Sequence, residues 1–113
     1  ALNTLVTPEG DPVIDGFFEH VRPLTKEEHA MLDILARRMD EKAALEAVGA
    51  RVWARNAGWR QALENYVSRP TLTIEGLVGG YGGAGGKTIQ PHKMTAKRDM
   101  RLVPDMTPED IMA

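Results

Sequence analysis

A glycine-rich stretch, residues 79–88 with the sequence GGYGGAGGKT, most resembles a ligand-binding motif. Six of its ten residues are glycine, and its Gly-Lys-Thr ending is typical of phosphate-binding loops. Such a loop needs a glycine where this chain has Tyr81, and it must lead into a helix whose free N–H groups hold the phosphates. Pro91 and a strand-like pattern follow instead. We therefore expect the glycines to form a turn between two strands rather than a nucleotide site.

Few other residues could carry out chemistry. The three histidines, His20, His29 and His92, are far apart, and no HExxH pattern is present. The chain has no cysteine, which removes thiolate nucleophiles, disulfides and cysteine-based zinc sites, and Ser68 is its only serine. Paired carboxylates occur where helices begin, and we interpret them as helix caps. We predict no catalytic and no metal-binding residue in this chain.

Composition indicates one globular domain. The chain has 113 residues, 42% hydrophobic and 27% charged, and no apolar run long enough to cross a bilayer. A net charge of −2 argues against a nucleic-acid-binding protein, and the absence of cysteine fits a cytoplasmic location. Residues 87–101 nevertheless carry five basic side chains against one acidic side chain. This segment suits either an anionic partner or a solvated strand face.

The pattern predicts mixed secondary structure in the first half of the chain. Residues 1–6 are typical of the end of a helix, turn residues follow, and residues 17–23 are expected to be extended. Thr25 begins the longest helical pattern, which stops at Gly49. Asp40 could cap a second helix, so a break near residues 38–40 is possible.

The second half continues with one more helix and two strands. Residues 58–67 form a helical pattern that ends before Pro70, and the period then changes to two. After the glycine loop, alternation resumes with Arg98 out of place among the apolar positions, and TPED at 107–110 begins a final helix. Two strands alone are marginal in water. We therefore expect a piece of a larger unit, or a sheet that another chain completes.

The run from Arg69 to Ile111 resembles the central domain of the dinuclear-zinc peptidases of the carnosinase, aminoacylase and carboxypeptidase G type. Its elements EGLVGGY, KTIQP, RLVP and TPED match that pattern, with the threonine of KTIQP and the arginine of RLVP thirteen residues apart. The earlier segment GDPVIDGFFEHVRPLTKEE is similar to the corresponding part of carnosinase-like members. The resemblance covers nearly the whole chain.

This resemblance implies an α+β fold, namely an incomplete ferredoxin-like domain with an antiparallel sheet and helices packed on one face. Residues 1–113 would form a lid, or dimerisation, domain truncated at both ends, without the catalytic domain of the parent enzyme. That absent domain would hold two zinc or other divalent ions and hydrolyse dipeptides or N-acyl amino acids. The lid would pair with its counterpart in a homodimer.

The resemblance also implies two substrate-binding residues, Thr88 and Arg101, which would reach the active site of the neighbouring subunit. A guanidinium is a planar, permanently charged group suited to a peptide carboxylate. Arg101 could instead pair with Asp99 at the surface. The sequence departs from the family pattern at Gln90 and Arg98, where apolar residues are usual.

Two other hypotheses about the function remain. The chain could be a stand-alone α+β interaction module that dimerises through exposed sheet edges. A weaker third hypothesis is an anion- or nucleotide-binding module built on residues 79–101.

Overall fold

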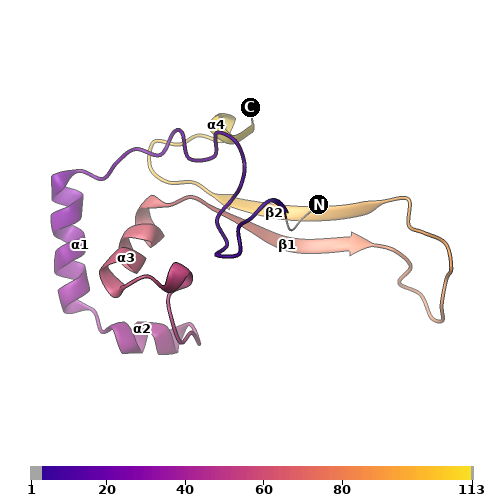
Figure 1. The fold of residues 1–113 in the computed structure, drawn as a ribbon, viewed down its shortest axis with the longest axis horizontal. Coiled ribbons are helices and arrows are strands. Elements are labelled where there is room, and N and C mark those ends of the chain that lie inside the picture. Colours follow the sequence, from indigo (N-terminus) through magenta and orange to yellow (C-terminus); the bar gives the residue numbers. More distant parts are fainter. Residues whose placement is uncertain (1–3, 113) are drawn as a thin grey trace.

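The computed structural model describes residues 4–112 as an elongated α+β unit that measures 58 × 36 × 19 Å. A long two-stranded hairpin extends to one side, and the helices gather at the other side (Figure 1). The elements, in chain order, are α1 (Lys26–Arg38), α2 (Glu41–Ala47), the 3₁₀ helix η2 (Ala54–Asn56), α3 (Trp59–Ser68), β1 (Thr71–Gly79), β2 (Met94–Arg101) and α4 (Glu109–Met112). The predicted α+β class is confirmed.

The segment before α1 folds back on itself at its start. Val6 forms an isolated antiparallel bridge with Pro12, and Gly10, with φ of +88°, lies in the intervening turn. The helix predicted for residues 1–6 is therefore wrong at Val6, because the turn pairs this residue with a later part of the chain. Residues 1–3 lie outside the described part.

Residues 17–23 begin with turns and not with the predicted extended chain. Three backbone hydrogen bonds close these turns, from the N–H groups of Phe17, Glu19 and Val21 to the carbonyls of Ile14, Gly16 and Phe18 at 3.1, 3.0 and 3.2 Å. The turns bury the Phe17 ring, which is only 2% exposed. Burial of such a side chain contributes about 1.5–3 kcal/mol, which outweighs the weak local preference for an extended chain.

The longest helical pattern forms two helices, as the possible break near residues 38–40 suggested. Thr25 and Glu28 make the predicted capping box, with the Glu28 N–H donating to Thr25 Oγ1 at 3.2 Å and the Thr25 N–H donating to Glu28 Oε2 at 2.8 Å. Met39 is extended, and the Asp40 carboxylate caps α2 by accepting from two backbone N–H groups. Gly49 follows α2 with φ of +65°, the left-handed conformation common after a helix.

Helices α1 and α3 pack against each other around Leu32, which is 4% exposed. The indole N–H of Trp59 donates to the carbonyl of Ala36 at 3.1 Å and ties the start of α3 to α1. The apolar contact around Leu32 and this hydrogen bond together hold the two helices against each other.

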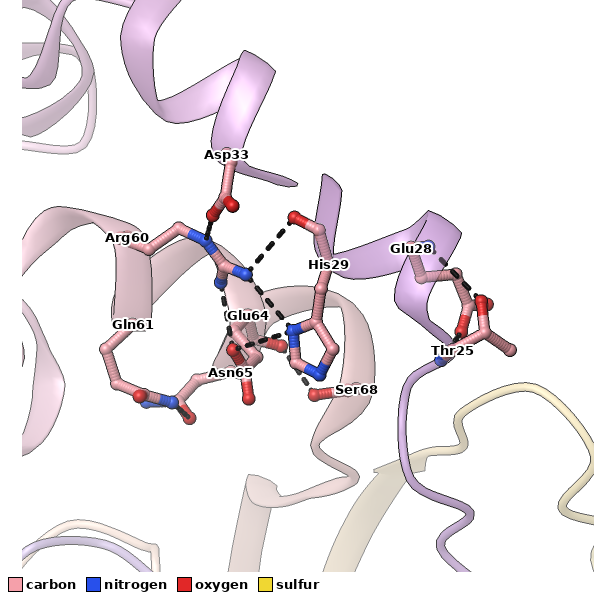
Figure 2. A network of polar contacts seen from close by, with 9 residues as sticks. All are labelled: Thr25, Glu28, His29, Asp33, Arg60, Gln61, Glu64, Asn65 and Ser68. Atoms are coloured by element: carbon pink, nitrogen blue, oxygen red, sulfur yellow. Dashed lines mark hydrogen bonds and ion pairs between the residues drawn. The ribbon is translucent and has the colours of Figure 1, made fainter. Parts of the chain in front are cut away.

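A polar network centred on Arg60 reinforces the same helix pair (Figure 2). Arg60 Nε donates to Asp33 Oδ1 at 2.6 Å, and Arg60 Nη1 donates to Glu64 Oε2 at 2.9 Å. Arg60 Nη2 also lies 3.2 Å from Nδ1 of His29, whose ring is about half exposed. The hydrogen bond and positive charge of Arg60 lower the pKa of Asp33. His29 therefore takes part in helix packing at the surface.

The two strands pair in antiparallel register, with one β-bulge at Glu75. Ile74 pairs with Arg98, but the next pair is Gly76 with Lys97, so the bulge shifts the alternation of β1 by one residue. As a result Leu77 returns to the face that holds Ile74. This face is open, with Ile74 48% and Leu77 52% exposed, and Arg98 therefore lies among apolar residues without being buried.

A carboxylate junction holds the first segment against the rest of the chain. The Asp11 carboxylate accepts from Arg55, which belongs to η2, and from Arg69, which precedes β1, with Arg69 Nη2 at 2.9 Å. The Arg69 guanidinium also lies 4.7 Å from the centre of the Phe18 ring. The hydrogen bond from Arg55 is the main cause that lowers the pKa of Asp11.

The packing of Leu32 predicts a clear stability difference between two leucines of α1. Leu32→Ala should lower the free energy of unfolding by roughly 2–4 kcal/mol, because it removes a buried side chain and leaves a cavity. Leu35→Ala, at a side chain that is 41% exposed, should cost less than about 1 kcal/mol. Urea unfolding followed by circular dichroism measures both, and equal losses would contradict the packing described here.

The Arg22–Glu28 pair predicts acid sensitivity. Arg22 donates to both carboxylate oxygens of Glu28 at 2.8 and 2.7 Å, and these bonds, with that from the Thr25 N–H, lower the Glu28 pKa from 4.5 to about 2. Because the folded pKa is the lower one, the stabilisation is complete above the ordinary pKa and is lost as the pH falls toward 2. Glu28→Gln should therefore destabilise the protein at neutral pH.

The same substitution should make urea unfolding less dependent on pH between about 5 and 2. Glu27→Gln is the matched control, since Glu27 lies in the same turn and forms no ion pair among the described residues. An unchanged pH dependence in Glu28→Gln would contradict the role of the pair.

Candidate functional site

Arg101 lies at the end of β2, where it pairs with Thr71. Its side chain is 80% exposed, and its Nε donates to Asp99 Oδ2 at 3.4 Å, the long limit of a hydrogen bond. The surface pair expected from the sequence is thus present but weak. The terminal guanidinium nitrogens have no partner within residues 4–112 and are free to hold a planar anion.

Thr88 lies in the long loop of residues 80–93 that joins β1 to β2. Its side chain is exposed and makes no hydrogen bond to any of the described residues. The chain after Thr88 remains a loop until β2 begins at Met94, so no helix N-terminus stands behind the Gly-Lys-Thr sequence. The phosphate-loop geometry is therefore not formed.

The structure separates these two residues within one chain. The loop of residues 80–93 lies at one end of the hairpin, and Arg101 ends β2 at the other end, next to the helices (Figure 1). With a rise of about 3.3 Å per residue, the length of β2 puts more than about 20 Å between the loop and Arg101. A dipeptide spans only about 7 Å. A single dipeptide cannot contact both residues of the same chain, so the expectation that both would reach the same neighbouring active site is wrong for a dipeptide substrate.

The hairpin tip also contains a hollow of about 570 Å³ that the sequence did not predict. Its lining comes from the end of β1, the loop and the start of β2. Tyr81 shapes the loop here, since its hydroxyl donates to the carbonyl of Ala84 at 3.0 Å. The ring passes so close to Gly83 that a Cβ atom there would lie 2.5 Å from the Tyr81 oxygen. A larger residue at this position would therefore have to displace the Tyr81 ring.

The hollow is basic. Lys87, His92 and Lys93 contribute to its lining, whereas no aspartate or glutamate does. The ammonium of Lys87 lies 5.3 Å from the centre of the Tyr81 ring. Gln90, one of the two departures from the family pattern, adds an amide to the lining. The excess of basic residues in residues 87–101 was the signal in the sequence that pointed to this region.

A second, apolar hollow of about 210 Å³ lies between α1, α3 and residues 103–104, and brings together no set of polar residues typical of a catalytic site. Over residues 4–112, no three or more histidine, aspartate or glutamate residues gather in a way that could hold a metal ion. Nor does that part of the chain contain a helix of the length and hydrophobicity needed to span a membrane. The hairpin is therefore the region with the strongest features for binding.

Comparisons with known proteins agree on one family. No model of a protein family matches the chain. Over 110 residues it is 33% identical to the Cys-Gly metallodipeptidase dug1 of Schizosaccharomyces pombe. This alignment covers 97% of this chain and 22% of that protein. The chain thus spans about a fifth of the length of the curated relatives that it matches.

Solved structures show the same similarity. The M20 family metallo-carboxypeptidase Sso-CP2 from Sulfolobus solfataricus superposes with a TM-score of 0.80 and 34% identity, over 98% of this chain and 28% of that protein. Human carnosine dipeptidase 1 also gives a TM-score of 0.80, with 25% identity over 98% of this chain and 23% of that protein. This chain is a partial domain of the M20 family of metallopeptidases.

Proposed function

We propose that this chain is the lid domain of a zinc-dependent metallopeptidase, in which it mediates dimerisation and recognises the carboxylate of the substrate. The observation that carries the proposal is the exposed guanidinium of Arg101, which has one weak contact, on a hairpin of the M20 fold. An Arg side chain can hold a carboxylate with two parallel charge-assisted hydrogen bonds. The relatives named metallodipeptidases support a peptide substrate.

The parent enzyme would hydrolyse dipeptides or N-acyl amino acids. Two zinc or other divalent ions, held outside this chain, would supply a metal-activated water as the nucleophile. The residues of this chain would then bind and orient the substrate: Arg101 through its carboxylate, and Thr88 through its hydroxyl and the adjacent backbone N–H groups. Precise orientation of this kind lowers the entropic part of the reaction barrier.

The distance between the two residues supports a site built by two subunits. Thr88 and Arg101 of one chain are too far apart for one dipeptide, so a site that uses both must take them from different chains. The two-stranded sheet has an unpaired edge on each strand among the described residues, which is a suitable surface for strand pairing with a second lid. We therefore infer that the homodimer completes each active site.

Arg101→Ala in the full-length enzyme should lower kcat/KM for dipeptides with a free C-terminal carboxylate by roughly 10- to 100-fold, since a charged hydrogen-bonded pair is lost. For substrates with an amidated C-terminus, kcat/KM should differ little between the variant and the wild-type enzyme. Steady-state kinetics with both substrate types gives the comparison, and metal content measured in parallel should be unchanged.

Arg98→Ala is the matched control, because Arg98 is on the same strand but faces the opposite side of the sheet. If it reduces kcat/KM as strongly as Arg101→Ala, the effect is one of general charge, and the assignment of Arg101 is wrong. A full-length gene product that dimerises but hydrolyses no dipeptide or N-acyl amino acid would instead support the stand-alone interaction module, which the free sheet edges also favour.

A further inference from the structure

We propose that the basic hollow at the hairpin tip binds an acidic side chain of the peptide substrate, so that the parent enzyme favours acidic dipeptides. The proposal rests on the function proposed above and names the class of substrate. The hollow, with a volume of about 570 Å³, falls within the range of about 300–1,000 Å³ that is common for small-molecule sites.

The charges in the hollow favour an anion. Lys87, His92 and Lys93 line it, and no carboxylate does. Within residues 4–112 neither lysine forms an ion pair, in contrast to Arg22, Arg55 and Arg60, which all have carboxylate partners. Two ammonium groups without a partner at one hollow create a positive potential that attracts a negatively charged group.

The loop also holds its polar groups in place. The hydrogen bond from Tyr81 to Ala84 fixes the ring, and Lys87 lies over that ring. Such a contact with an aromatic face orients an ammonium without neutralising it.

The other lining residues suit an acidic amino-acid side chain. Val78, Ile89 and Pro91 provide apolar surface for the methylene groups, and the Gln90 amide can donate to a carboxylate oxygen. Phosphate groups of a nucleotide would require a helix N-terminus behind the loop, which the chain lacks here.

The position of the hollow connects it to the substrate. Lys87 and Ile89, on either side of Thr88 in the sequence, both line it. Consecutive Cα atoms are about 3.8 Å apart, so Thr88, which does not itself line the hollow, lies directly beside two residues that do. The hollow and Thr88 thus belong to one recognition surface on the loop of residues 80–93.

The test uses the full-length enzyme and two dipeptides of nearly equal shape, Glu-Gly and Gln-Gly. The ratio of their kcat/KM values should favour Glu-Gly in the wild-type enzyme. The same ratio should fall about tenfold in Lys93→Gln, because this substitution removes one charged hydrogen-bond donor. Lys97→Gln makes the same change in charge four residues further along, on β2; Lys97 does not line the hollow, so this variant should keep the ratio.

A Glu-Gly to Gln-Gly ratio of kcat/KM near one in the wild-type enzyme would overturn the proposal. An equal decrease of this ratio in the two variants would also overturn it. If neither dipeptide is hydrolysed, the proposed peptidase function fails, and isothermal titration with glutarate then tests the hollow by itself. Glutarate binding that Lys93→Gln weakens about tenfold, and Lys97→Gln does not, would still support an anion site. Absence of glutarate binding would overturn it.

Discussion

The antiparallel register of β1 and β2 positions every candidate functional residue of the chain. Because Gly79 pairs with Met94, the loop of residues 80–93 extends from the far end of the hairpin, and Arg101 lies at the near end. The bulge at Glu75 keeps Leu72, Ile74 and Leu77 of β1 on one face after the register shift. A register changed by one residue would exchange the two faces of the sheet and move Arg101 among the apolar side chains.

The core that supports this hairpin is small. Phe17, Leu32 and two prolines, Pro12 and Pro70, are the only side chains that are more than nine-tenths buried in the described part of the chain. Charged clusters around Asp11 and Arg60 therefore connect segments that share little apolar contact. Partly exposed ion pairs contribute at most about 1 kcal/mol each, so these clusters mainly set the orientation of the segments. The open sheet face is consistent with further cover from the rest of the parent protein.

Local signals in the sequence predicted the helices from α1 onward well, because capping depends on neighbours along the chain, but the helix expected at residues 1–6 is wrong at Val6. Thr25, Asp40 and Gly49 each act where the sequence indicated. The turns around Phe17 and the bulge at Glu75 could not be predicted, because they depend on burial and on strand pairing with residues far along the chain. For the candidate site, the sequence located Thr88 and Arg101 on a loop and on a strand, but their separation and the basic hollow follow only from the folded hairpin.

The most direct measurement for the two-subunit site combines two impaired variants of the full-length enzyme in one dimer. Thr88→Ala and Arg101→Ala subunits, co-expressed with different affinity tags, give a purified heterodimer whose dipeptide hydrolysis can be compared with that of each homodimer. If each site takes Thr88 from one subunit and Arg101 from the other, one site of the heterodimer is intact and about half of the normal activity returns. No recovery of activity in a heterodimer that forms would contradict the shared site.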